Sequence, residues 1–76
     1  MNNVRRKSLR ELMEELESIR DGIQELLEQE EEYRDNMPEN LQNSEKYEQA
    51  EEACDNLASA VDSMDEAISC VEEAIA

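Results

Sequence analysis

Two apolar heptad repeats of equal length, separated by the only proline, most constrain the fold of this sequence. In each repeat, apolar side chains recur at alternating spacings of three and four residues, the a and d positions of a coiled-coil heptad. A repeat covers 29 residues, and a helix of that length measures about 43 Å. Pro38 lacks a backbone N–H and disfavours helix in the preceding residue, so the first helix should end near it. The pattern therefore predicts two helices that fold back on each other.

The first repeat runs over residues 9–37, and only Glu30 interrupts it. Met13 and Leu27 fall at e positions and broaden the apolar stripe. The a positions are Leu9, Leu16, Ile23, Glu30 and Met37, and the d positions are Leu12, Ile19, Leu26 and Tyr33. Gly22 also lies inside this helix and costs about 1 kcal/mol relative to alanine. We interpret it as a tolerated surface glycine rather than a close helix contact.

The second repeat runs over residues 47–75 without a polar interruption. Its a and d positions are Tyr47, Ala50, Cys54, Leu57, Val61, Met64, Ile68, Val71 and Ile75. Beside them a row of alanines occupies g positions, at Ala53, Ala60, Ala67 and Ala74. This row makes the stripe wide and flat, so that a neighbouring helix can approach closely.

We predict an all-α fold, a single antiparallel two-helix hairpin that resembles a coiled coil. The expected bounds are about 4–37 for the first helix, 38–43 for the loop and about 44–75 for the second helix. Candidate N-caps are Ser8 (with Glu11 in a capping box), Asn2 or Asn3 for the first helix, and Asn43 or Ser44 for the second. Because a lone hairpin exposes one side of each stripe, we expect two copies to form a four-helix bundle. The alternative is that the exposed stripe binds a different protein.

Composition excludes several classes of function. The chain has 22 acidic and 7 basic residues, a net charge of −15 and no histidine. This charge opposes direct binding to nucleic acid or to an anionic membrane, and the lack of histidine removes the commonest catalytic base and zinc ligand. No stretch is long and apolar enough for a membrane span, and none has the pattern of a signal peptide. We expect a cytoplasmic interaction protein without cofactor or metal, and not an enzyme.

The charge is unevenly distributed. Residues 1–10 carry +4 and no acid, whereas residues 11–76 carry −19. Acids concentrate around the loop, and eight of them are the predicted partner-binding face: Glu28, Glu31, Glu32, Asp35, Glu48, Glu51, Glu52 and Asp55. Such a face can be merely solvated, can bind divalent metal weakly or can mimic a nucleic-acid backbone. The sequence lacks a calcium-binding loop, and a hairpin offers no cleft for a carboxylate pair that hydrolyses sugars.

A second candidate site mixes polar and aromatic residues around the loop. It comprises Tyr33, Arg34, Asn36, Asn40 and Tyr47, and it can be extended by Arg5, Arg6 and Arg10 from a second subunit. Loop capping explains most of this composition, and the alternative is a hot spot for a small ligand or a partner. For the basic residues 1–10 we favour ion pairs with Glu72 and Glu73 over phosphate binding.

The two cysteines do not suggest catalysis or a disulfide. Cys54 falls on the seam and Cys70 at an outer c position. On one helix they are about 24 Å apart, too far for a disulfide. Neither has a histidine or lysine beside it that would favour a catalytic thiolate. Both are typical of a reducing compartment.

The stretch from Glu30 to Glu51, and above all the loop string DNMPENLQ at residues 35–42, resembles a group of small acidic helical proteins. These are encoded by phages and mobile elements of Gram-positive bacteria. The resemblance covers most of the chain, and it implies a viral or mobile-element origin and the host bacterial cytoplasm. It carries no biochemical activity and no active-site residues.

Three hypotheses of function follow. The first is a phage anti-defence inhibitor whose acidic face acts as a nucleic-acid mimic against a host nuclease or another nucleic-acid-handling protein with a basic surface. The second is an oligomeric sponge that sequesters an anionic nucleotide signal between subunits. The third is a plain helical scaffold that only associates with itself.

Overall fold

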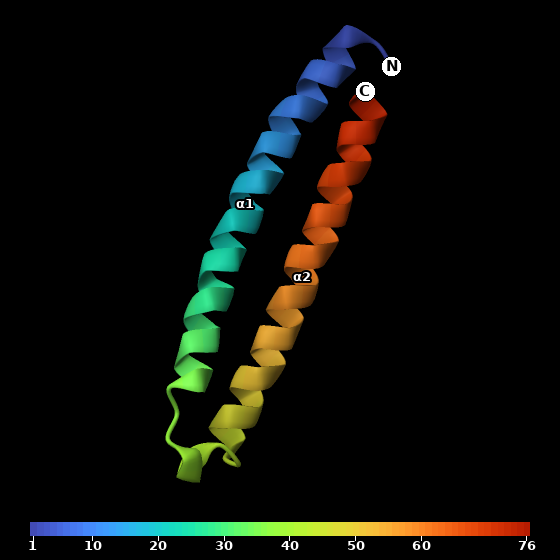
Figure 1. The fold of residues 1–76 in the computed structure, drawn as a ribbon. Coiled ribbons are helices and arrows are strands. Elements are labelled where there is room, and N and C mark those ends of the chain that lie inside the picture. The colour runs from blue at the N-terminus through green and yellow to red at the C-terminus, as the bar shows by residue number, and fades with distance from the viewer.

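The computed structural model describes residues 1–76 and consists of two long helices joined by a short loop. Helix α1 spans Asn3–Asp35, a short 3-10 helix η1 spans Glu39–Leu41, and α2 spans Glu45–Ile75. The two long helices pack against each other side by side, with both termini at one end and the loop at the other (Figure 1). The molecule is a rod with extents of 59 × 14 × 13 Å. The predicted all-α helical hairpin is confirmed.

Side-chain caps start both helices. The Asn2 carboxamide oxygen accepts a hydrogen bond from the Arg5 backbone N–H at 2.8 Å, so Ser8 lies within α1 and is not its cap. The Ser44 hydroxyl accepts from the Tyr47 N–H at 3.3 Å and starts α2. Each cap satisfies one of the amide donors that a helix N-terminus leaves free.

The loop ends α1 slightly earlier than the proline alone predicts. Helix α1 stops at Asp35, and the Asn36 N–H still bonds to the Glu32 carbonyl. Met37, the residue before Pro38, lies outside the helix, as the steric clash of that position requires. No residue of the loop has positive φ, so the chain reverses through η1 without needing a glycine.

The core is thin and lies mostly on α2. Six residues are buried, and four of them are a positions of the second heptad repeat. The six are Leu27, Ala50, Cys54, Val61, Ile68 and Ile75. The a row of α2 therefore points at α1 along the whole rod. In the neighbouring g row, Ala53 and Ala60 are half-buried, and Ala67 and Ala74 are exposed.

Helix α1 presents a different pair of rows from the predicted one. Its d row is exposed, at 58% for Leu12, 57% for Ile19, 58% for Leu26 and 51% for Tyr33. The buried or half-buried positions beside the a row are instead its e row: Arg6, Met13, Arg20, Leu27 and Arg34. The a row of α1 is half-buried as expected, but the d row does not pack against α2. Two helices alone can cover only one side of the a row, and the side carrying Leu27 and three arginine stems is the covered one.

Glu30 does not lie at a frayed helix end. It is half-buried on the a row, and α1 continues for five more residues to Asp35. It forms no ion pair with Arg34, whose guanidinium bonds to Asp35 at 3.0 Å.

Candidate functional site

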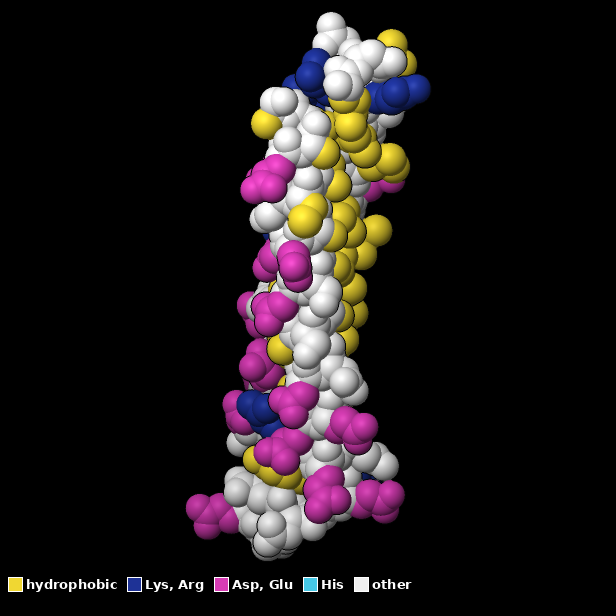
Figure 2. Space-filling view, turned by 90° about the vertical axis from the view of Figure 1, so that its right-hand side faces the viewer, with side chains coloured by type: hydrophobic (Ala, Val, Ile, Leu, Met, Phe, Trp, Pro, Cys, Tyr) yellow, Lys and Arg dark blue, Asp and Glu magenta, His cyan; other side chains and the backbone are white.

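The two long sides of the rod differ in chemistry. Hydrophobic side chains form a nearly continuous stripe along one side, and acidic side chains follow the opposite side and the loop end (Figure 2). On α1 the stripe corresponds to the exposed d row, and on α2 to the d and g rows, which lie on the same side of an antiparallel pair. We call this side the open face: Leu12, Ile19, Leu26 and Tyr33 of α1 with Leu57, Ala60, Met64, Ala67, Val71 and Ala74 of α2.

The acidic residues predicted to bind a partner all lie in the loop half of the rod. Seven of the eight are exposed, and Glu31 is half-buried. Only Asp35 has an ion-pair partner in the chain, namely Arg34. Glu28 accepts a single hydrogen bond from Gln24 at 3.2 Å. Seven carboxylates of this acidic patch are therefore free to pair with cations from another molecule.

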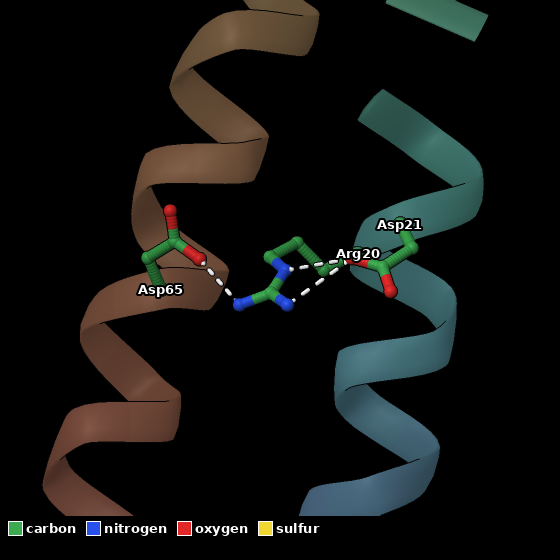
Figure 3. Close-up of polar contacts among 3 residues, drawn as sticks. All are labelled: Arg20, Asp21 and Asp65. Carbon is green, nitrogen blue, oxygen red and sulfur yellow. Dashed lines mark hydrogen bonds and ion pairs between the residues drawn. The ribbon is translucent and has the colours of Figure 1, made fainter. Parts of the chain in front are cut away.

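Arginine stems close the side of the helix contact that lies opposite the open face. Arg20 of α1 reaches across to α2, where Nη1 lies 2.9 Å from Asp65 Oδ1, while Nη2 lies 3.1 Å from Asp21 on its own helix (Figure 3). Hydrogen bonds to Asp65 and then Asp21 raise the pKa of Arg20. This bridge is the one ion pair that joins the helices.

The thiols lie as the sequence predicts. Cys54 is buried in the seam, Cys70 is exposed, and both are free. Burial raises the pKa of the Cys54 thiol, and the charge of Arg34 opposes this while Glu31 and Glu30 add to it. A thiol kept protonated inside the seam is a packing group and not a nucleophile.

The mixed polar and aromatic cluster is divided within one chain. At the loop end, a hollow of about 640 Å³ is lined by Tyr33, Asn36, Met37, Pro38, Leu41, Ser44 and Lys46. Arg34, Asn40 and Tyr47 do not line it, and Arg5, Arg6 and Arg10 belong to the first turns of α1, at the opposite end of the rod. A single copy therefore does not assemble the predicted ligand site.

The basic N-terminal segment also differs from expectation. No residue among 1–10 forms an ion pair, so the predicted pairing with Glu72 and Glu73 is wrong. Arg6 Nη1 donates to the Asn3 side chain at 3.3 Å, and Arg6 Nε is buried without a partner. The cations of residues 5–10 thus remain available to another molecule.

No group of three or more cysteine, aspartate or glutamate side chains is arranged to hold a metal ion. No helix has the length and apolarity that crossing a membrane requires.

Sequence reasoning missed one feature, the charge-free side of α2. The c, d and g rows of this helix contain no charged residue between positions 49 and 74, although 38% of the chain is charged. These residues are Gln49, Ala50, Ala53, Asn56, Leu57, Ala60, Ser63, Met64, Ala67, Cys70, Val71 and Ala74. The sequence pattern that could have revealed this side is the c row, whose uncharged residues extend the apolar stripe into a wider uncharged surface.

No protein-family model, curated protein or solved structure matches this chain.

Proposed function

We propose that this protein is a non-enzymatic, phage-type inhibitor that works as a dimer in the cytoplasm of a Gram-positive host. Two hairpins form a four-helix bundle through their apolar stripes. The acidic patch, which faces away from those stripes, occupies the basic nucleic-acid-binding surface of a host defence protein or another nucleic-acid-handling protein. The protein itself contacts neither nucleic acid nor membrane.

The charge density at the loop half of the rod carries this proposal. Residues 28–35 and 45–55 hold ten acids against Arg34 and Lys46, a net charge of −8. They lie side by side over about 15 Å of helix, the length of the longer segment at ~1.5 Å per residue. Duplex DNA carries about nine charges over the same length, at one per ~1.7 Å. A surface that binds DNA therefore meets a similar density of negative charge on this protein.

The rod also has the stiffness and shape that mimicry requires. The carboxylates stand on two packed helices rather than on a mobile loop, so their spacing is set before binding and little entropy is lost. With extents of 59 × 14 × 13 Å, the molecule is long and narrow enough to lie along an extended basic surface. Unpaired carboxylates on one side also steer the protein towards a cationic partner, most strongly at low salt.

Affinity recovery from a Gram-positive host lysate at low salt, read out by native mass spectrometry, tests the proposal. The test variant reverses four acids of the patch to lysine: Glu48, Glu51, Glu52 and Asp55. The control reverses four exposed acids in the terminal half of the rod: Glu14, Glu66, Glu72 and Glu73. Both variants carry the same net charge, so only the position of the charges differs.

The expected result is a stoichiometric host protein with a basic surface, recovered by the wild-type protein and the control but not by the patch variant. It should dissociate as salt rises, because screening weakens each exposed charge pair. Equal recovery by the patch variant would refute the electrostatic mechanism. Recovery of a small anionic ligand instead of a protein would favour the nucleotide sponge.

A further inference from the structure

We propose that a second copy packs antiparallel onto the open face, with the two α1 helices crossing at Gly22. The inference specifies the dimer contained in the proposed function, but it does not depend on the acidic patch or its target. It identifies the interface, the orientation and the residues that one copy contributes to the loop end of the other.

The surface that this hairpin exposes is large enough for such a partner. The chain exposes 5704 Å², whereas a globular protein of 8.8 kDa exposes about 4,800 Å². One long side of a rod measuring 59 by 14 Å has an area of about 800 Å², which is what each partner contributes to a standard interface. The open face therefore offers the area that a stable dimer needs.

The positions of the exposed apolar residues indicate a two-fold axis across the rod. Seven large hydrophobic residues are exposed, and the four on the d row of α1 form two pairs centred on the same point between Gly22 and Ile23. The pairs are Leu12 with Tyr33 and Ile19 with Leu26. In an antiparallel dimer with its axis at this point, each residue meets its pair on the other copy. A two-fold interface requires this self-complementarity.

Gly22 lies at the centre of this pattern and has no role within one chain. A side chain at this position would meet no atom within 4 Å, and its φ is not positive. The hairpin therefore gains nothing from a glycine that weakens the helix by about 1 kcal/mol. On the rim of the open face, beside Ile19 and Leu26, a missing side chain lets the α1 backbone of a second copy approach closely.

Charge selects the antiparallel orientation over the parallel one. Residues 28–55 carry eleven acids against Arg34 and Lys46, a net −9, whereas residues 1–10 carry +4. A parallel dimer would place the two −9 segments side by side. The antiparallel dimer places each of them next to the basic N-terminal segment of the other copy, whose cations form no ion pair in the hairpin.

The same arrangement completes the divided cluster at the loop end. In the antiparallel dimer, the first turn of α1, with Val4 and Arg5, lies at the loop end of the other copy. Val4 is 76% exposed in the hairpin, and Leu41 lines the hollow with Met37 and Pro38. The N-terminal turn of one copy therefore covers the apolar loop of the other, and Arg5 comes close to Glu39.

Sedimentation equilibrium tests the face. Leu26→Glu places a charge in the open face, and Ser59→Glu places the same charge on an exposed position of α2 outside it. We expect the wild-type protein and Ser59→Glu to sediment at twice the 8.8 kDa of the chain, and Leu26→Glu to dissociate at least about 100-fold more readily. A wild-type protein that stays monomeric at millimolar concentration, or equal dissociation of both variants, would overturn the proposal.

Disulfide cross-linking tests the orientation. In a Cys70→Ser background, Glu15→Cys and Gln29→Cys place thiols on the g row, seven residues on either side of Gly22. In the antiparallel dimer a mixture of the two chains cross-links and neither chain cross-links with itself. In a parallel dimer positions 15 and 29 of the two copies are about 21 Å apart along the rod, so the mixture does not cross-link, and that result would refute the proposed orientation.

The two proposals fail separately in these experiments. A lysate that yields no protein target leaves the cross-linking pattern of the purified protein unchanged. Conversely, if the purified protein is a monomer but still recovers a host protein, the proposed dimer is refuted and the proposed inhibition through the acidic patch stands. A third outcome is a host protein that binds the open face through an apolar surface. Such a protein would bind Leu26→Glu poorly and would reduce cross-linking between copies, and this result would overturn the homodimer.

Discussion

The two flanks of the α1 a row differ in what covers them, although both are rich in large side chains. On one flank, Leu27 is buried, and Met13 and three arginines (Arg6, Arg20 and Arg34) are half-buried. On the other, the d row of leucine, isoleucine and tyrosine residues is more than half exposed. The arginine flank can face water without a partner molecule, because its guanidinium groups remain hydrated while their stems cover apolar surface. The aliphatic flank has no such polar end.

The arginine flank is therefore stable in water within a single chain, whereas the aliphatic flank needs another molecule to cover it. A contiguous apolar stripe of this length is uncommon on monomeric proteins and marks an interaction site. The two adjacent residues Leu26 and Leu27 show the contrast most clearly, since one is 58% exposed and the other 6%. Variants at these positions separate hairpin stability from association.

The largest expected effect comes from truncating one or the other of these leucines. Leu27→Ala removes a buried side chain from a core of six residues and should cost about 2–3 kcal/mol in the free energy of unfolding. Leu26→Ala should cost less than about 0.5 kcal/mol at concentrations where the chain is monomeric. Urea unfolding followed by circular dichroism measures both. Equal losses would mean that the d row contributes as much as the e row to packing within the hairpin.

Gly22→Ala should stabilise the dilute hairpin. The new methyl group meets nothing within 4 Å, and alanine exceeds glycine in helix propensity by about 1 kcal/mol. The same variant should weaken the dimer, because the methyl group separates the crossing backbones. Thermal unfolding at low concentration and sedimentation at high concentration give the two readings. A tighter dimer would contradict the crossing at Gly22.

The free energy of unfolding should fall at alkaline pH because the thiol of Cys54 is buried. Burial raises the pKa of Cys54, so the unfolded chain loses this proton at a lower pH than the folded one. The stabilisation is therefore complete below the unfolded thiol pKa, about 8.5, and is lost as pH rises towards the folded value. Urea unfolding between pH 7.5 and 9.5 should show this decline in the wild-type protein and in Cys70→Ala. A decline that persists in Cys54→Ala would assign it to other groups.

The smallest effect should come from the bridge between the helices. Arg20 and Asp65 are both accessible to water, and exposed pairs contribute little because solvent and salt screen them. Arg20→Gln and Asp65→Asn should each lower stability by less than Leu27→Ala, and the double variant should lose less than their sum. Strict additivity in that double-mutant cycle would show that the bridge does not form in solution.

Much of the fold was predictable because it depends on local rules. The caps at Asn2 and Ser44 were among the candidates, and the helix bounds lie within two residues of those predicted. Ion pairs were less predictable, since Arg34 bonds to its neighbour Asp35 rather than to Glu30. A flexible side chain on the surface selects among several nearby acids by small energy differences that no sequence pattern records.

The sequence by itself determined the two helices, their turn at Pro38 and the a row of α2 as the centre of the seam, because heptad periodicity, capping and the missing proline N–H act locally. Only the tertiary structure decided which side of α1 the seam covers. The d and e positions lie on opposite sides of the a row in a helix of about 3.6 residues per turn. A rotation of α1 about its own axis exchanges them, and only packing against α2 selects one side.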